Sequence, residues 1–290
     1  MSKRPGQHEP QPTATLLAAA SATVNIDGVT LTLTHPDRFV SEWIDYYDYQ
    51  RQLAAAWLRL SDKEPPLNPR LIGESGLGKT TLACAAGRAL GLDVYLFQCT
   101  MDTRPEDLLI MPVLTGDKRV EYRASSLVSA MVKGGVLILD EGNRMPERAW
   151  ASLAPLMDER RYIESSITAL KIHAHPDFRL CVTMNDDTSV FELPGYIQSR
   201  LKPKIEVVRP PVDIQKQILR AKCPGVDDVI LRDVFALINA RSKEIGDSVR
   251  DVLSLAQYAQ KLKAQGFKEP LRKAAEQVLT KPEVGSDAAK

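Results

Sequence analysis

One eight-residue stretch constrains this chain more than any other. Residues 73–80 read Gly-Glu-Ser-Gly-Leu-Gly-Lys-Thr, which is the GxxxxGK[ST] spacing of a phosphate-binding loop. The stretch lies between a short apolar run, Arg70 to Gly73, and an alanine-rich run from Lys79 to Leu90 that favours a helix. Its glycines permit a tight turn whose backbone N–H groups face phosphate oxygens, and the following helix adds its positive end. The sequence therefore predicts a strand, a phosphate cradle and a helix, in that order.

Two side chains of this loop have distinct tasks in such a cradle. The Lys79 ammonium is expected to reach the β- and γ-phosphates of a nucleotide, and the Thr80 hydroxyl to bind Mg²⁺. ATP and Mg²⁺ are the expected cofactors, although the pattern does not separate ATP from GTP. The expected cofactor-binding residues of the loop and the helix start are Gly73, Glu74, Ser75, Gly76, Leu77, Gly78, Lys79, Thr80 and Thr81.

A second apolar run ends in two adjacent carboxylates. Val136 to Asp140 is typical of a buried strand, and Glu141 follows it directly. Because parallel strands end at the sheet edge where the phosphate loop lies, Asp140 is expected to bind the nucleotide's Mg²⁺. Glu141 is the expected catalytic group that polarises the attacking water. Asn185, after a later apolar run from Phe178 to Met184, is expected to orient the same water.

Short apolar runs alternate with helical stretches through the middle of the chain. Further strands are expected at Val94 to Gln98 and at Ile205 to Val208, and the pattern after Pro211 is helical. This alternation predicts an α/β fold, a parallel sheet sandwiched by helices and followed by a small all-helical lid domain. The expected divisions are residues 1–35 for a tail and a possible short hairpin, 36–210 for the nucleotide-binding domain, 211–280 for the lid and 281–290 for a flexible tail.

Three other segments carry local expectations. Val24 to Leu33 alternates around an Asp-Gly pair, which is typical of a hairpin. Phe39 to Leu60 has one apolar side and predicts a helix. A helix is also expected from Glu147 to Glu159, with a kink at Pro155.

Composition narrows the class of protein. Of the 290 residues 44% are hydrophobic and 26% are charged, and the formal net charge is +1. The chain therefore lacks a global basic field for nucleic acid or an anionic membrane. The four cysteines form no CxxC pair, which fits a reducing compartment. No stretch approaches the roughly 18 apolar residues that span a bilayer, so a cytoplasmic protein is expected.

Two further motifs and two expected hairpins carry a resemblance to a known family. The motifs are residues 140–146, Asp-Glu-Gly-Asn-Arg-Met-Pro, and residues 156–163, Leu-Met-Asp-Glu-Arg-Arg-Tyr-Ile. The hairpins are expected at Val113 to Tyr122 and at about Tyr162 to Ala174. From about residue 71 to residue 250 the chain resembles the AAA+ ATPases, and within them the MoxR-type branch with its helix-2 insert. That branch is related to magnesium-chelatase ATPase subunits and dynein-like modules, and its inserts usually face a central pore or a client.

The resemblance implies roles for three arginines. Arg200 takes the place of the arginine finger that one subunit offers to its neighbour's nucleotide. Ser199 and Leu201 depart from the acid and the aromatic residue that MoxR-type proteins usually carry there. Arg250 matches the second sensor of the helical lid, which acts at the phosphates during catalysis. Arg144 either acts across the subunit interface or forms a simple salt bridge.

The resemblance also implies an assembly and a task. It implies an ATPase, converting ATP and water to ADP and phosphate, in a homo-oligomeric ring that is most simply a hexamer. The expected output is remodelling or maturing a client protein, for which a von Willebrand A domain is a candidate. The alternative is a nucleic-acid motor or an NTPase subunit of a restriction or defence system. Lys118, Arg119 and Arg123 in the first hairpin keep that alternative open, and Glu141 argues against a scaffold with little turnover.

Overall fold

The computed structural model describes residues 22–38, 42–186, 192–241 and 248–279. The tails expected over residues 1–21 and 281–290 lie outside these ranges. Within the described ranges, no helix has both the length and the apolar character that crossing a membrane requires.

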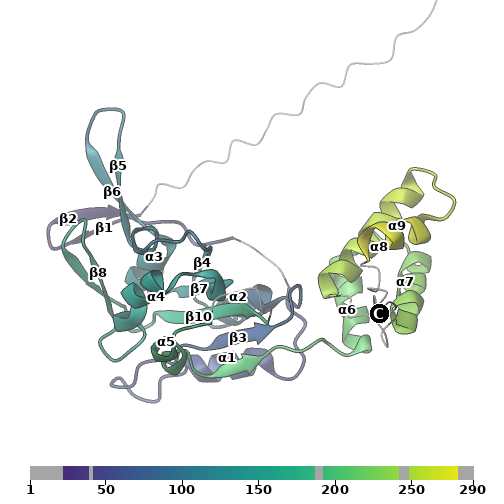
Figure 1. Ribbon diagram of the computed structural model, residues 1–290, viewed down its shortest axis with the longest axis horizontal. Helices are drawn as coiled ribbons and strands as arrows, with labels where there is room; N and C mark the ends of the chain where they lie inside the picture. Colours follow the sequence, from purple (N-terminus) through teal and green to yellow (C-terminus); the bar gives the residue numbers. More distant parts are fainter. Residues whose placement is uncertain (1–21, 39–41, 187–191, 242–247, 280–290) are drawn as a thin grey trace, which may run out of the picture.

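The centre of the molecule is a five-stranded parallel sheet in the order β11-β3-β10-β7-β4 (Figure 1). Its strands are β3 (Arg70–Gly73), β4 (Val94–Gln98), β7 (Val136–Asp140), β10 (Arg179–Asn185) and β11 (Lys204–Glu206). The expected bounds of β4 and β7 are confirmed. β10 begins one residue later than expected, and β11 ends before Val207 and Val208.

Helices cover both faces of this sheet. Along β7, Leu137 and Leu139 belong to one apolar core and Val136 and Ile138 to the other, so the strand alternates between two buried faces. The helices of the domain are α1 (Tyr49–Trp57), α2 (Lys79–Ala89), α3 (Ser126–Lys133), α4 (Glu147–Leu153) and α5 (Gly195–Arg200). The predicted α/β sandwich is therefore confirmed.

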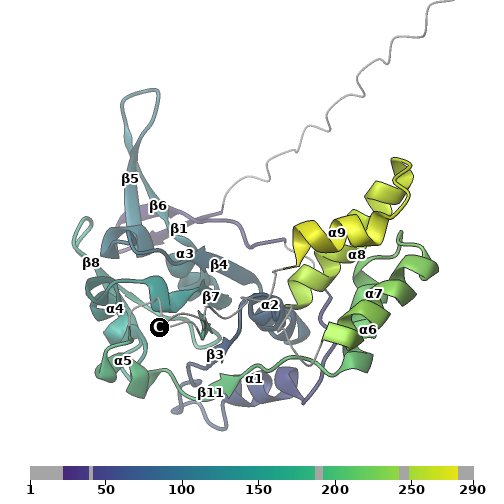
Figure 2. The same ribbon diagram turned by 45° about the vertical axis from the view of Figure 1, so that its right-hand side comes forward.

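After the sheet the described chain is helical. The helices are α6 (Val212–Lys222), α7 (Asp228–Arg241), α8 (Val249–Ala264) and α9 (Pro270–Val278). They share an apolar core of their own, with Leu219, Val234 and Leu255 fully buried in it. Figures 1 and 2 show this group at one side of the sheet, joined to β11 by a single extended connector. The exact domain boundaries, at residues 36, 211 and 281, stay predictions.

A second sheet joins two hairpins that are distant in sequence. It has the order β1-β2-β6-β5, with β1 (Thr23–Ile26), β2 (Val29–Thr32), β5 (Ile110–Leu114) and β6 (Val120–Ala124). Both hairpins follow the expectation, but the parallel pairing of β2 with β6 does not. Leu31 on β2 is fully buried in the core beneath this sheet. Beyond it the β5–β6 hairpin projects from the body (Figure 1).

The second expected hairpin is also present. It consists of β8 (Tyr162–Ser165) and β9 (Leu170–His173), paired antiparallel. The helix before it ends early: α4 stops at Leu153, and a 3₁₀ turn, Ala154–Leu156, replaces the expected continuation to Glu159. The reason is Pro155, which lacks the N–H that a continuing helix needs.

The helix expected from residue 39 to residue 60 is wrong in its first half. Residues 39–41 lie outside the described chain, and α1 begins only at Tyr49, after Tyr47 and Asp48 with φ of 59° and 56°. The aromatic side chains suggested a helical face, but Trp43 and Tyr46 lie in a non-helical segment and pack on one another and on Tyr49, the first residue of α1. The rings of Trp43 and Tyr46 stack at 5.4 Å, and those of Tyr46 and Tyr49 meet edge to face at 5.3 Å.

This segment, residues 42–49, is here named the aromatic strap. The Tyr46 hydroxyl donates to the carbonyl of Val208 at 2.9 Å, and the Tyr49 hydroxyl donates to the carbonyl of Glu206 at 3.0 Å. The Tyr49 oxygen also accepts from the Val208 N–H at 3.1 Å. The strap therefore fixes the start of the connector between the sheet and α6.

Candidate nucleotide-binding site

The phosphate loop has the backbone that its glycines predicted. Gly76 has a φ of 80°, and a Cβ on it would lie 2.7 Å from the Ser248 hydroxyl at the start of α8. A Cβ on Gly73 would lie 2.2 Å from the carbonyl oxygen of Val207. Larger residues are thus excluded on both sides, and the loop packs directly against the connector and the helical region.

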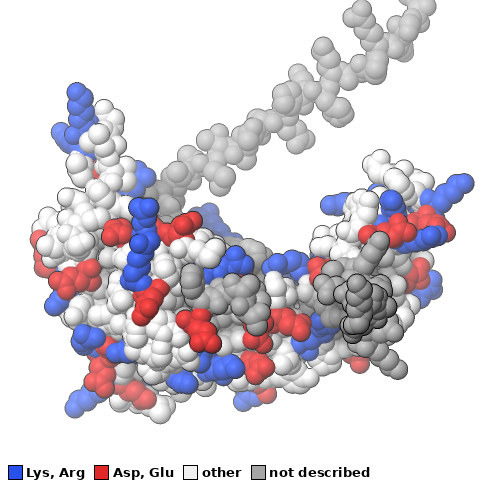
Figure 3. Space-filling view, viewed as in Figure 1, with Lys and Arg blue, Asp and Glu red and all other residues white. Residues whose placement is uncertain are grey.

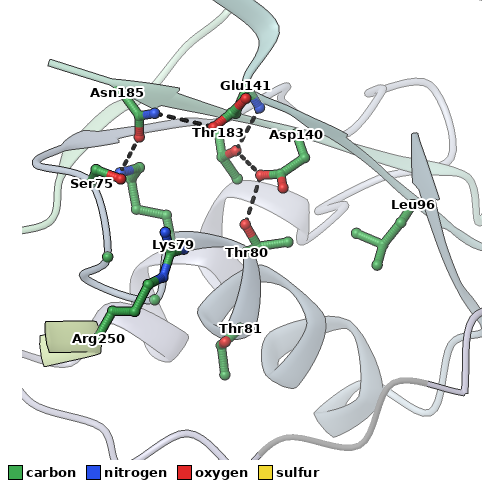
Figure 4. A pocket seen from close by; sticks show the side chains of 12 residues that line it. Ser75, Lys79, Thr80, Thr81, Leu96, Asp140, Glu141, Thr183, Asn185 and Arg250 are labelled. Carbon is green, nitrogen blue, oxygen red and sulfur yellow. Dashed lines mark hydrogen bonds between the residues drawn. The ribbon is translucent and has the colours of Figure 1, made fainter. Parts of the chain in front are cut away.

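A cavity of about 330 Å³ lies over the start of α2 (Figure 4). It brings together most of the residues that the sequence singled out, from the loop, two strand ends and α8. Its lining residues are Ser75, Gly76, Gly78, Lys79, Thr80, Thr81, Leu96, Asp140, Glu141, Thr183, Asn185 and Arg250. Gly73, Glu74, Leu77 and Arg200 do not line it. The volume falls within the range of about 300–1,000 Å³ that is usual for small-molecule sites.

The Lys79 ammonium is held inside the loop. It is 6% exposed. Its Nζ donates to the carbonyls of Gly73 at 2.8 Å and Glu74 at 2.7 Å, and to Asn185 Oδ1 at 2.9 Å. These neutral oxygens fix the charge at the floor of the cavity, in the position from which a lysine holds nucleotide phosphates.

Asp140 is tied to the first turn of α2 and to β10. Its Oδ1 accepts from the Thr80 hydroxyl at 2.6 Å and also from the Thr183 hydroxyl. A hydroxyl and a carboxylate at one point are oxygen ligands of the kind that Mg²⁺ prefers. Among the described residues no group of three His, Cys, Asp or Glu side chains could hold a metal ion alone. Mg²⁺ at nucleotide sites needs only one or two carboxylates besides phosphates and water, so Thr80 and Asp140 fit it.

Glu141 is surrounded by hydrogen-bond donors. Its Oε2 accepts from Gln98 Nε2 at 3.1 Å and lies 3.0 Å from Arg144 Nε, while Oε1 accepts from Asn185 Nδ2 at 3.3 Å. Its backbone has a φ of 54°, and its N–H donates to the Thr183 hydroxyl at 3.1 Å. Within one chain, Arg144 therefore forms the simple salt bridge that was one of its two expected roles. The donors keep the carboxylate oriented towards the cavity.

Asn185 links the phosphate end of the site to the catalytic end. Its amide oxygen faces the Lys79 ammonium and its amide nitrogen faces the Glu141 carboxylate. Only this orientation of the amide satisfies both neighbours, because ammonium only donates and carboxylate only accepts. Figure 4 shows the amide between these two side chains.

Arg250 reaches the same cavity from the helical region. It lies in the first turn of α8, where Ser248 accepts from the Asp251 N–H at 3.2 Å and closes the helix start. A cation in a first helical turn opposes the helix dipole, and a phosphate beside it would reverse that penalty. Figure 4 shows the Arg250 side chain extending from α8 towards the cavity that Lys79 also lines.

Arg200 lies away from its own chain's cavity. At the end of α5 its Nη1 donates to the Tyr196 carbonyl at 2.8 Å, and its Nη2 lies 3.5 Å from Asp158 Oδ2. Hydrogen bonds hold the pKa of Asp158 below its ordinary value, with the largest contribution from Arg160 and a smaller one from Arg200. A finger offered to a neighbouring subunit and a local ion pair both fit this position.

Sequence reasoning missed several residues around the site. Thr183 lies two residues before Asn185 on β10 and therefore on the same face, a signal that strand periodicity offers. Gln98 ends β4 directly opposite Asp140 in the register, which follows only from the strand order. Trp43, which lies in the segment expected to be a helix, contacts the loop: a Cβ on Gly78 would be 3.2 Å from its ring.

A second cavity, also of about 330 Å³, adjoins the first and shares Gly76, Gly78, Thr81 and Arg250 with it. It lies between the aromatic strap, the loop and the helices α6 and α8. Its apolar wall comes from Trp43, Ile44, Leu77, Ile218, Val249 and Leu253, and its polar groups from Glu42, Lys222, Ser254 and Gln257.

Comparisons with known proteins agree with this architecture. Residues 70–201 match the family described as AAA domain, dynein-related subfamily. Structures of the Thermotoga maritima RuvB Holliday junction branch migration motor are similar in fold. One has a TM-score of 0.54 at 17% identity, covering 80% of this chain and 69% of that chain. A point mutant of the same motor has a TM-score of 0.57 at 17% identity, covering 83% of this chain and 72% of that chain.

Curated relatives of this chain include uncharacterised staphylococcal proteins. One from Staphylococcus haemolyticus is 26% identical over 175 residues, which is 58% of this chain and 65% of the relative. One from Staphylococcus saprophyticus is 23% identical over 180 residues, with the same shares. The chain thus spans 65% of the length of these relatives. The family match and the structural likeness together support an AAA+ ATPase fold for this chain.

Proposed function

We propose that this chain is an AAA+ ATPase subunit that binds ATP with Mg²⁺ and hydrolyses it to ADP and phosphate. The observation that carries the proposal is the row of contacts from Lys79 through Asn185 to Glu141, beside the Thr80–Asp140 pair. It joins a phosphate-binding cation, a polar relay, a candidate base and a magnesium-binding pair in one cavity. Thr80 and Asp140 would hold Mg²⁺ here, and the ion would help to neutralise the charge that develops on the phosphates.

In the proposed reaction the chain's own groups divide the work. Lys79 and the loop N–H groups hold the phosphates, and Arg250 closes on them from α8. Glu141 accepts the proton of the attacking water. To bind that water, its carboxylate must give up at least one of its contacts with Gln98, Arg144 and Asn185. Asn185 holds the water between the carboxylate and the γ-phosphate.

Lys79→Ala is expected to abolish nucleotide binding while the fold persists. ATP at about a hundred times its dissociation constant should stabilise the wild-type chain by roughly 2.7 kcal/mol. Thermal melts with and without ATP measure this, with the exposed Lys268→Ala as a matched control that keeps the ATP effect. An equal ATP shift in Lys79→Ala and the wild type would remove the loop from the proposal.

We assign the second cavity to the nucleoside part of ATP. It adjoins the phosphate cavity, has an apolar wall and carries polar groups that suit the edge of a base. Trp43 is the one aromatic ring among its lining residues, stacked on Tyr46 and pressed against Gly78.

Trp43→Ala should therefore weaken ATP binding by about tenfold or more, because it removes the stacking face for the base. Tripolyphosphate, which has no base, should bind the variant and the wild type equally. Calorimetry with both ligands separates the two contributions, and Trp43→Phe should restore most of the ATP affinity. Equal losses for ATP and tripolyphosphate would mean that Trp43 supports the loop rather than the base.

We further propose a MoxR-type cytoplasmic ring, most simply a hexamer, that remodels a client protein, with a von Willebrand A domain as candidate client. The β5–β6 hairpin supports a client contact because it projects from the body and exposes Leu114 and Val120 at 70% and 56% (Figure 1). Capture of co-purifying proteins by a Glu141→Gln chain with ATP tests this proposal. Identical captured sets with Glu141→Gln and Lys79→Ala would contradict a nucleotide-dependent client.

A nucleic-acid motor is the second candidate. Figure 3 shows Lys and Arg side chains over the tip of the β5–β6 hairpin, where Lys118 and Arg119 lie in the turn. The fold is also similar to a protein titled a branch migration motor. DNA-stimulated ATPase activity with steep salt dependence, lost in a Lys118→Ala and Arg119→Ala double variant, would favour this candidate over the first.

A further inference from the structure

Two guanidinium groups converge on one carbonyl oxygen at the end of the sheet away from the nucleotide cavity. Arg161 Nη2 donates to the carbonyl of Phe178 at 2.9 Å, and Arg179 Nη1 donates to the same oxygen at 3.2 Å. Arg179 is the first residue of β10, whereas Asn185, at the nucleotide site, is the last. Like charges rarely share one acceptor, so this meeting point concentrates positive charge.

Arg179 is almost completely enclosed there. It is 9% exposed, and its Nε has no hydrogen-bond partner among the described residues. Burial, and to a lesser extent Arg59, lower its pKa, while Asp177 partly offsets them. Asp177 therefore supplies some negative charge, but the enclosed Nε–H of Arg179 stays without a hydrogen bond among the described residues, which costs free energy.

Arg59 brings a third positive charge to the same place. Its Nη2 donates to the carbonyl of Asp62 at 2.8 Å and its Nε to the carbonyl of Glu64 at 3.3 Å. Burial first, then the charges of Arg179 and Arg59, lower the pKa of Arg161 to about 10. The hydrogen bonds that these three arginines form among the described residues thus go to carbonyl oxygens rather than to carboxylates.

A cavity of about 340 Å³ opens beside the cluster, between the loop of residues 59–66, the base of the β8–β9 hairpin and residues 174–176. Arg59, Lys63 and Arg161 line it, as do Asp62, Glu64 and Glu159. The three acids are exposed, and Asp62, which lies 3.6 Å from Arg59, is fully so. Water screens these rim carboxylates, whereas the arginines are largely enclosed.

We infer that this arginine cavity binds a phosphate group, either free phosphate or a phosphomonoester carried on a larger molecule. Arg59 and Arg161, which line the cavity, would hold its oxygens, and the charge of Arg179, which does not line it, would add to theirs. Guanidinium forks match the oxygens of phosphate. A phosphate dianion also neutralises more of the clustered charge than a carboxylate does. Its binding would tie the loop of residues 59–66 to the base of the β8–β9 hairpin.

The test uses the full chain carrying Lys79→Ala, so that the nucleotide loop no longer holds phosphate. Calorimetric titration with inorganic phosphate and with phosphoserine, at constant ionic strength set by chloride, measures binding. We expect saturable binding of at least one of them, and the tighter of the two identifies the source. Arg161→Gln and Arg59→Gln, each added to this chain, should weaken it by about tenfold or more.

Arg51→Gln is the matched control, because Arg51 is an exposed arginine on α1, and it should leave the affinity unchanged. In chains with an intact Lys79, stabilisation by ATP verifies that each arginine variant folds. If Arg161→Gln does not fold, the phosphate affinity of Arg59→Gln tests the inference alone. Three results would each overturn the inference. The first is equal phosphate affinity in Arg59→Gln and Arg51→Gln, and the second is the absence of phosphate binding to the Lys79→Ala chain. The third is acetate binding as tight as phosphate binding.

Discussion

Arg200→Ala should bind ATP almost normally and yet lose about 10³- to 10⁵-fold in hydrolysis rate. The expectation rests on Arg200 acting at a neighbouring subunit's nucleotide, since it does not line the cavity of its own chain. The guanidinium would stabilise charge that develops only in the transition state, so binding is spared. Steady-state turnover and ATP-dependent melting measure the two effects, with the exposed Arg148→Ala on α4 as the matched control.

Mixing two variant chains distinguishes an arginine finger that acts between subunits from a contact that Arg200 makes within its own chain. Lys79→Ala chains cannot bind ATP but still offer Arg200, so adding them to Arg200→Ala chains should restore some turnover. No rescue at any mixing ratio would contradict a finger that acts between subunits. A purely structural pair with Asp158, 3.5 Å away, predicts something else: Arg200→Ala and Asp158→Asn would both lose stability and keep turnover per folded chain. Arg144 would then be the next candidate finger.

Glu141→Gln is the second large effect, an expected loss of about 10² to 10⁴ in turnover with ATP binding retained. The amide cannot accept the proton of the attacking water. It also presents an NH₂ group to the donors of Gln98, Arg144 and Asn185, so at least one contact must rearrange. Single-turnover hydrolysis measures the chemical step, and ATP-dependent melting measures binding.

The control for this variant is Glu121→Gln, which removes an exposed carboxylate on β6 and should leave turnover unchanged. Turnover by Glu141→Gln near the wild-type rate would remove Glu141 from its proposed role. Arg144→Gln is a further comparison, because it removes the ion pair that holds the Glu141 carboxylate but keeps the carboxylate itself. Its effect should therefore be much smaller than that of Glu141→Gln.

The parts of the fold that follow from contiguous residues were predictable from the sequence. β7 is a run of apolar residues that must be buried on both faces, and the Lys79–Ala89 helix is an alanine-rich run that directly follows the glycine motif. Most of the predicted loop and strand-end residues meet in one cavity, because parallel strands end at the same edge of the sheet. Placing Asn185 at the site from the sequence required only the assumption that its strand belongs to the same sheet.

What failed depends on contacts between distant segments. The pairing of β2 with β6 joins residues 31–32 to residues 122–123, and no local pattern specifies such a partner. The aromatic strap has helix-like spacing, yet Tyr46 and Tyr49 bond to the connector instead. The contact of Trp43 with Gly78 was not predicted for the same reason, because it depends on the non-helical course of the strap. The arginine cavity likewise exists only where three separate segments meet.

The tyrosine bonds of the strap also determine where the helical region can pivot. They hold residues 206–208 to the sheet, whereas Gln215 of α6 donates to the carbonyl of Pro210 at 2.8 Å, so Pro210 moves with the helices. A rotation of the helical region about the connector would therefore centre on Arg209, which lies between these two anchored segments. Arg209 itself lies 3.1 Å from the Glu74 carboxylate of the phosphate loop. Arg209 thus links this connector electrostatically to the loop with the phosphate-binding motif.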